Sequence, residues 1–207
     1  MVSAVAVLLL GLGGCGGSDD GKSSSGGDPT GSDPTETSTD VLETPLFPDD
    51  FEPVCEGATV SAATAYDQAA ADHKALYFAT YEESLLDQSS RLPADWTVTF
   101  AATGNALQAV DLVACAVRTA DKLVRTCTGY QDDGVDTGNE VRWHTATYDV
   151  SVREATTGTE LTSKTIEATD KDCPSFVTFD EGEDSVDRYA EIPDNQVVAV
   201  LKPFVQP

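Results

Sequence analysis

Apolar and polar residues alternate over much of the second half of the chain, as they do in strands with one buried face. The alternation from 141 to 154 predicts one strand, and the Thr-rich run from 160 to 168 predicts its partner across a short turn. The aromatic segment 73–81 and the short run 96–100 predict two further strands. The pattern therefore indicates a mostly β protein built from hairpins.

Two β-prone runs in the middle of the chain, 110–118 and 123–130, are separated by four residues. They predict another hairpin. With a three-residue loop, the register places Cys115 opposite Cys127, where paired Cα atoms lie about 4.5 Å apart, within disulfide range. A shift of one residue in the register would remove this pairing.

The end of the chain changes to a helical period. Four apolar positions share the spacing i, i+3, i+4 and i+7, and they are Val197, Val200, Leu201 and Phe204. They predict a short C-terminal helix, with Asp194 as its N-cap and Pro203 forcing an early end. The Ala-rich segment 58–75 favours a second helix by propensity alone. The expected class is α+β, mostly β, with antiparallel hairpins forming a small sheet or sandwich.

The first residues carry a different signal. An apolar run from Val2 to Leu10 is too short to span a bilayer, which needs about 20 residues, but it suits the apolar part of a signal peptide. It is followed by Leu12-Gly13-Gly14-Cys15. This motif resembles the lipobox of bacterial lipoproteins. No Lys or Arg precedes the run, and we expect that the assigned start codon lies too far downstream.

The resemblance implies that residues 1–14 are a signal peptide and that Cys15 carries a diacylglyceryl thioether, with its freed amine acylated, for example by palmitate. Several acyl chains on one residue are enough for stable anchoring. Residues 15–50 are rich in Gly, Ser, Thr, Pro and acids, and predict a disordered linker. We therefore expect a domain over 51–207, held at the outer face of the cell membrane.

The net charge of the chain limits the classes of molecule that it can bind. The formal net charge is −24 and the pI is about 4.1. Nucleic-acid binding needs clustered Lys and Arg, so this role is excluded. Contact with a membrane is expected only through the acyl anchor. The remaining partner is an unknown protein or envelope ligand.

The cysteine count supports the same location. With Cys15 used for the lipid, four cysteines remain, an even number in an extracytoplasmic domain. The hairpin register favours the pair Cys115–Cys127 and leaves Cys55–Cys173, although four cysteines allow three pairings. None has C-x-x-C spacing, so we expect no zinc site and no cofactor.

Several segments of the domain resemble recurring parts of uncharacterised bacterial extracytoplasmic domains. They are Cys55–Gly57, Val113-Ala114-Cys115, 126–130, Tyr148-Asp149-Val150 with 154–158, and Cys173-Pro174. These motifs are structural, and the resemblance implies no activity.

One acidic loop is a candidate calcium site, because calcium binds six to eight carboxylate and carbonyl oxygens. Its oxygen-bearing residues are Asp132, Asp133, Asp136, Asn139 and Glu140. The loop lacks the EF-hand spacing, so a plain hydrophilic loop is the favoured interpretation.

Catalytic signals are scarce. His73 and His144 are the only histidines, and no G-x-S-x-G elbow accompanies them. We expect no enzyme, but a non-enzymatic binding or interaction domain of unknown ligand. The alternatives are a cell-envelope hydrolase that uses dispersed carboxylates, which a deep cleft with convergent acids would favour, and a structural envelope component.

Overall fold

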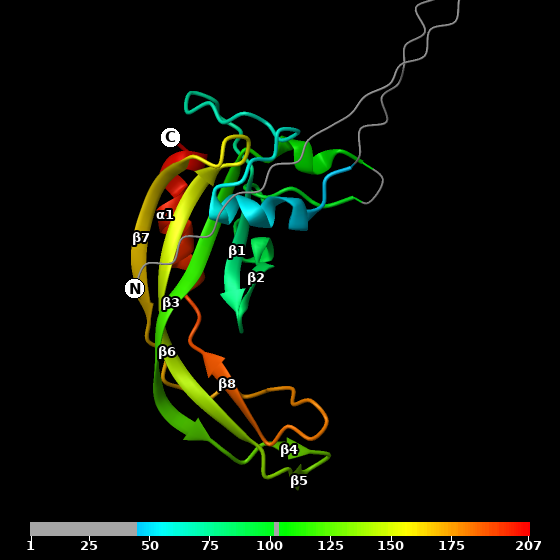
Figure 1. The fold of residues 1–207 in the computed structure, drawn as a ribbon, viewed down its shortest axis with the longest axis vertical. Helices are drawn as coiled ribbons and strands as arrows, with labels where there is room; N and C mark the ends of the chain where they lie inside the picture. Colours follow the sequence, from blue (N-terminus) through cyan, green and yellow to red (C-terminus); the bar gives the residue numbers. More distant parts are fainter. Residues whose placement is uncertain (1–44, 102–103) are drawn as a thin grey trace, which may run out of the picture. The chain divides into compact units, whose positions relative to one another are not determined.

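A six-stranded mixed β-sheet forms the centre of the computed structural model, which describes residues 45–101 and 104–207 (Figure 1). Its strands are β1 Ala75–Tyr81, β2 Ser84–Asp87, β3 Leu112–Cys127, β6 Glu140–Glu154, β7 Glu160–Ala168 and β8 Ser185–Tyr189. A separate hairpin consists of β4 Gln131–Asp132 and β5 Val135–Asp136. The helical elements are η1 Pro48–Glu56, η2 Ser89–Arg91, η3 Ala106–Ala109 and α1 Asp194–Val205.

The strands lie in the order β2-β1-β3-β6-β7, and β8 pairs with the lower part of β6. The pairs β1–β3 and β6–β8 are parallel, and the others are antiparallel. β7 pairs with residues 146–153 of β6, and β8 pairs with residues 140–144. One side of β6 is therefore shared by two strands that follow one another along it.

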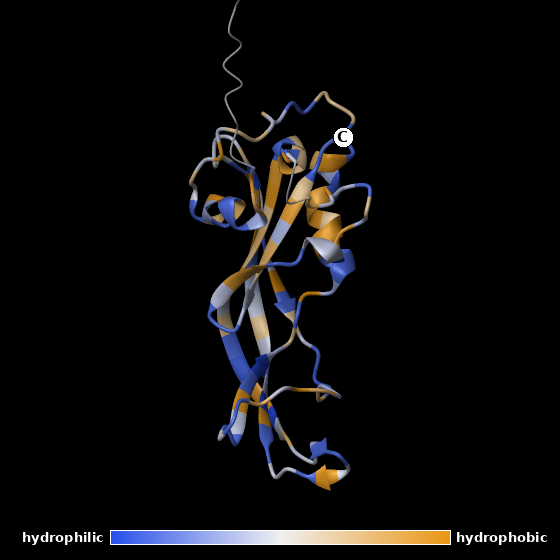
Figure 2. Cartoon of the chain, turned by 90° about the vertical axis from the view of Figure 1, so that its right-hand side faces the viewer, coloured by the Kyte–Doolittle hydropathy of each residue, from blue (hydrophilic) through white to orange (hydrophobic). Residues whose placement is uncertain are grey.

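Helical elements cover both faces of the upper part of the sheet. Side chains alternate between the two faces of a strand, so one strand can contribute to a core on each face. In β3, Leu112 and Ala114 belong to the core under α1, whereas Val113 and Cys115 belong to a second core under η1. Figure 2 shows the apolar residues gathered on the sheet and on the helix beside the C-terminus. The result is three layers with two cores.

β3 and β6 continue as a two-stranded ribbon beyond the end of β1. The last β1–β3 pair joins Ala79 and Ala116, but β3 stays paired with β6 as far as Cys127. The register shifts between Arg118 and Ala120 and again further on, as at β-bulges, which increase twist. β8 and the tip of β1 lie on the same side of this ribbon (Figure 1).

The fold class is confirmed as α+β, mostly β, with a C-terminal helix. The predicted strands at 73–81, 141–154 and 160–168 correspond to β1, β6 and β7. The two parallel strand pairs were not predicted. Parallel strands need a crossover connection that carries the chain from the end of one strand back to the start of the other. A pattern of local alternation does not reveal such a connection.

Four local predictions are wrong. Residues 96–100 form no strand, and 58–75 contain turns and irregular backbone instead of a helix. Asp194 is the first residue of α1, and Pro193 occupies the cap position without a side-chain cap bond. Pro203 lies inside the helix, which continues to Val205.

The predicted hairpin at 110–130 is also wrong, and so is the disulfide pairing that depended on it. Both runs belong to one strand, β3, which places Cys115 and Cys127 twelve residues, or about 40 Å, apart. The disulfides are Cys55–Cys115 and Cys127–Cys173, with Cα–Cα distances of 5.6 and 5.9 Å. The first joins η1 to β3, and the second joins the end of β3 to the loop before β8.

The two disulfides indicate an oxidising, extracytoplasmic environment. No helix in the described ranges is both long enough and apolar enough to cross a bilayer. The predicted signal peptide 1–14, the predicted lipidation site Cys15 and the predicted linker up to residue 44 lie outside the described residues. The first element, η1, begins at Pro48, just before the expected domain start at residue 51.

Candidate functional site: an arginine–tyrosine pocket

A small pocket lies where β1, β3, β6 and β8 meet on the α1 side of the sheet. It is lined by Tyr77, Ala79, Thr80, Tyr81, Glu82, Gln88, Arg91, Arg118, Tyr148, Arg188, Tyr189, Glu191 and Ile192. Its volume is about 40 Å³, which is room for about three water molecules. Three of the six arginines of a chain with net charge −24 line this one pocket. It is therefore a basic site in an acidic protein.

The sheet places Arg118 at the centre of the pocket. Arg118 follows Ala116 by two residues, so its side chain lies on the α1 face, and it pairs across the ladder with Tyr148 of β6. Its guanidinium carbon lies 3.5 Å from the ring centroid of Tyr189 in β8, a cation–π contact. Its Nη2 donates to the carbonyl of Glu82, and its backbone N–H donates to Thr80 Oγ1 at 3.0 Å.

The other two arginines already have carboxylate partners. Arg91 lies 2.9 Å from Glu191 and 2.7 Å from Asp194. Arg188 Nη1 lies 3.0 Å from Glu82 Oε1. These acids are mostly exposed, and the three ion pairs lie at the rim of the pocket.

Arg118 differs from both. Among the described residues it forms no ion pair with a carboxylate, and its Nη1 is a buried donor without a hydrogen-bond partner. A guanidinium cannot lose its proton in a protein, so its charge must be met by another group. The pocket therefore contains one uncompensated positive charge with a donor available for a ligand.

The tyrosines of the pocket stay neutral at physiological pH. Burial raises the pKa of Tyr77 to about 12, although Arg91 partly opposes the shift. Burial also raises the pKa of Tyr148 and of Tyr189, with Arg118 opposing both shifts. The Tyr148 hydroxyl donates to the carbonyl of Ala190 at 3.1 Å. No tyrosinate therefore neutralises the arginine.

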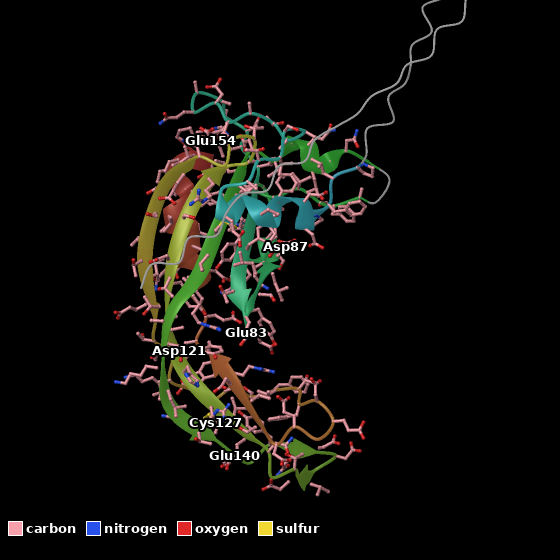
Figure 3. The ribbon with its side chains drawn as sticks, in the orientation of Figure 1. Glu83, Asp87, Asp121, Cys127, Glu140 and Glu154 are labelled. Carbon is pink, nitrogen blue, oxygen red and sulfur yellow. A yellow bond between two sulfur atoms is a disulfide. The ribbon has the colours of Figure 1, made fainter. Side chains whose placement is uncertain are left out.

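An open groove adjoins the pocket between the tip of the β1–β2 hairpin and β8. It is lined by Tyr81, Glu82, Glu83, Ser84, Leu86, Thr178, Asp180, Glu183, Val186, Asp187, Arg188 and Tyr189, and its volume is about 750 Å³. Figure 3 shows Glu83 at the hairpin tip, above β8. Four residues line both the groove and the pocket, so the two spaces are continuous. Five acids and one arginine make the groove strongly acidic.

Asp187 is a fixed negative charge in the groove. It accepts hydrogen bonds from Arg142, at 2.8 and 2.5 Å, and lies 2.8 Å from His144 Nε2. Mainly because of the Arg142 hydrogen bond, its pKa is lowered to about 2. His144 Nδ1 lies 2.7 Å from Asp121, so this imidazole joins β3 to β8.

The structure does not bring the calcium candidates together. Asp132, Asp133 and Asp136 lie on the small β4–β5 hairpin, and Asn139 and Glu140 follow it. Within residues 45–101 and 104–207, no group of three or more His, Cys, Asp or Glu side chains is placed to hold a metal.

His73 is part of a buried pair that the sequence did not indicate. Its Nδ1 lies 2.5 Å from Asp111 Oδ2, and Asp111 Oδ1 accepts from the backbone N–H of Lys74 at 3.0 Å. Its Nε2 is buried and has no hydrogen-bond partner among the described residues. The pair fixes the chain at the start of β1 to the start of β3.

The arginine pocket was missed by sequence reasoning, because its residues come from five separate segments. The one available signal was Arg118, a charge that continues the spacing of the apolar residues Leu112, Ala114 and Ala116. Comparisons with protein-family models, with curated proteins and with solved structures found no match. The site must therefore be interpreted from its own chemistry.

Proposed function

We propose that the chain is a lipid-anchored protein at the outer face of the cell membrane, and that its folded domain is a non-enzymatic binding module. In this proposal, Arg118 binds an anionic group of the ligand. The observation that carries the proposal is the buried, unpartnered Nη1 of Arg118 in a pocket where the other two arginines are already paired.

The energetics favour an anion at this position. A buried charge without a partner destabilises a protein by several kcal/mol. A carboxylate in the pocket would compensate the charge and accept a charge-assisted hydrogen bond, which is about twice as strong as a neutral one. The pocket, which has room for about three water molecules, can hold a group of this size.

The anchor completes the proposal. Cys15 in the lipobox-like motif would carry the acyl chains, and residues 16–44 would separate the membrane from the domain. The disulfides agree with an extracytoplasmic location. Growth with labelled palmitate should label the wild-type chain but not a Cys15→Ser variant; equal labelling of both would refute the anchor.

One acid of the groove, Asp187, does not suit the catalytic role that the hydrolase alternative requires. A glycosidase acid needs a raised pKa to hold its proton near neutral pH. Asp187 has instead a pKa of about 2 and stays ionised.

Binding is tested with the full-length Cys15→Ser variant, which cannot be lipidated. Sodium acetate is titrated at constant ionic strength while the amide NMR signals of Arg118 and Tyr189 are followed. We expect saturable shifts that vanish in Arg118→Gln. Arg125→Gln is the matched control, because Arg125 has the same charge on the same strand but is exposed outside the pocket. Shifts that persist in a folded Arg118→Gln protein would refute the site.

A further inference from the structure

We infer that the ligand is a peptide or protein tail whose C-terminal carboxylate enters the pocket and whose preceding residues are basic. This inference rests on the proposed function and adds the class of ligand. It follows from the opposite charges of the pocket and the groove, which are continuous through Tyr81, Glu82, Arg188 and Tyr189.

The charges change sign over a short distance. The pocket lining contains three arginines against Glu82 and Glu191, and Arg118 is the one without a carboxylate. The groove contains five acids against Arg188. A ligand that fills both spaces therefore needs one negative group at its end and positive groups next to it.

The net charge of the whole chain also favours a ligand that carries positive groups. With a net charge of −24, the protein repels polyanions and attracts cations before contact. A nucleotide or a polyphosphate would be repelled both by this field and by the acidic groove. A basic peptide with a single terminal carboxylate is favoured by the field and by the groove, and its carboxylate is favoured locally by Arg118.

The backbone of the groove suits an extended chain. β8 pairs with β6 on one side, and its other edge pairs with no strand in the part of the chain that the structure describes. β8 runs from Ser185 to Tyr189, five residues, or about 17 Å. Tyr189 lines the pocket, so an extended peptide with its carboxylate there would place about four or five residues along the acidic groove.

The ligand is tested with fluorescent six-residue peptides and the full-length Cys15→Ser protein. The first peptide has lysine at two of its last five positions and a free C-terminal carboxylate. The second is its C-terminal amide, and the third and fourth replace both lysines with glutamine or with glutamate. We expect the first to bind roughly tenfold tighter than the amide and than the glutamine peptide. The glutamate peptide should bind weakest, and added salt should reduce the differences.

Variants of the protein test where the carboxylate and the lysines of the peptide bind. Arg118→Gln should remove the preference for the free carboxylate. Glu83→Lys should weaken binding of the lysine peptide severalfold and leave the acetate response of Arg118 unchanged. The matched control is Glu167→Lys, which makes the same change in net charge at an exposed position of β7, outside the groove.

The outcomes separate the inference from the proposed function. If acetate binds at Arg118 but the amide or glutamate peptides bind as well as the first peptide, the inference is wrong and the proposed function stands. If neither acetate nor any peptide binds, the proposed function is itself refuted. Equal weakening by Glu83→Lys and Glu167→Lys would mean that overall charge, and not the groove, attracts the peptide, which also overturns the inference.

Discussion

Replacement of Gly158 by alanine should destabilise the domain more than any other glycine substitution in the described chain. Gly158 lies in the turn between β6 and β7, with φ at +67°, a left-handed conformation. A Cβ at this position would lie 2.4 Å from the carbonyl oxygen of Gly57 and 2.6 Å from that of Ala58. Both neighbours are backbone atoms next to η1, so no flexible side chain can move aside.

The magnitude has two parts. The left-handed backbone destabilises an alanine by about 1–2 kcal/mol, and a smaller gain from the restricted unfolded chain partly offsets it. The steric overlap adds roughly 1–3 kcal/mol, as for overpacking in a core. The free energy of unfolding should therefore fall by about 3 kcal/mol, which corresponds to a decrease in Tm of roughly 6–12 °C for a domain of this size.

The assay is urea and thermal unfolding followed by circular dichroism, with Gly182→Ala as the matched control. Gly182 has φ at +84°, but nothing lies within 4 Å of its Cβ position. The control measures the backbone term alone and should lose about 1 kcal/mol or less. If Gly158→Ala is no less stable than Gly182→Ala, the close approach of the turn to residues 57 and 58 is refuted.

Three further predictions concern the disulfides and two buried or paired acids. Tryptic digestion without reduction should join peptide 23–74 to 92–118 and peptide 126–142 to 172–188; any other linkage contradicts the observed pairing. The pKa of Asp187 falls from 3.8 to about 2 on folding, so its stabilisation is present above pH 3.8 and is lost as the pH falls towards 2. The difference in urea stability between wild type and Asp187→Asn should therefore shrink between pH 5 and pH 2.5, and a constant difference would oppose this assignment. Asp111→Ala leaves His73 and the Lys74 N–H without their acceptor and should lower the free energy of unfolding by about 3 kcal/mol. Exposed Asp180→Ala is its control, and equal stability of the two variants would contradict the role of the buried pair.

The sequence predicted those elements that have a strong local period. β7 begins and ends at the predicted residues 160 and 168. The C-terminal helix α1 contains the predicted apolar stripe of Val197, Val200, Leu201 and Phe204. The hairpin at 110–130 failed because residues 119–122 interrupt the apolar pattern without containing a Gly, Asn or Pro to turn the chain. In the structure a register shift beside Arg118 absorbs that interruption, and the strand continues.

The candidate site could not be predicted in the same way. Arg91, Arg118 and Arg188 are far apart in the sequence, and they meet only because β8 returns parallel to β6 beside the end of β1. Parallel pairing depends on long-range contacts and has no local signature. The acidic loop 132–140, by contrast, was visible in the sequence because its residues are contiguous.

The long β3–β6 ribbon also has a consequence for how the domain unfolds. One buried cluster extends from Leu201 in α1 through Ala114 to Trp143 and Val186 near the far end of the ribbon. β3 joins this cluster only near its two ends, because residues 117–126 between Ala116 and Cys127 are not buried. Amide hydrogens in this exposed middle part of β3 should thus exchange with solvent by local opening, and faster than those of the buried residues 112–116.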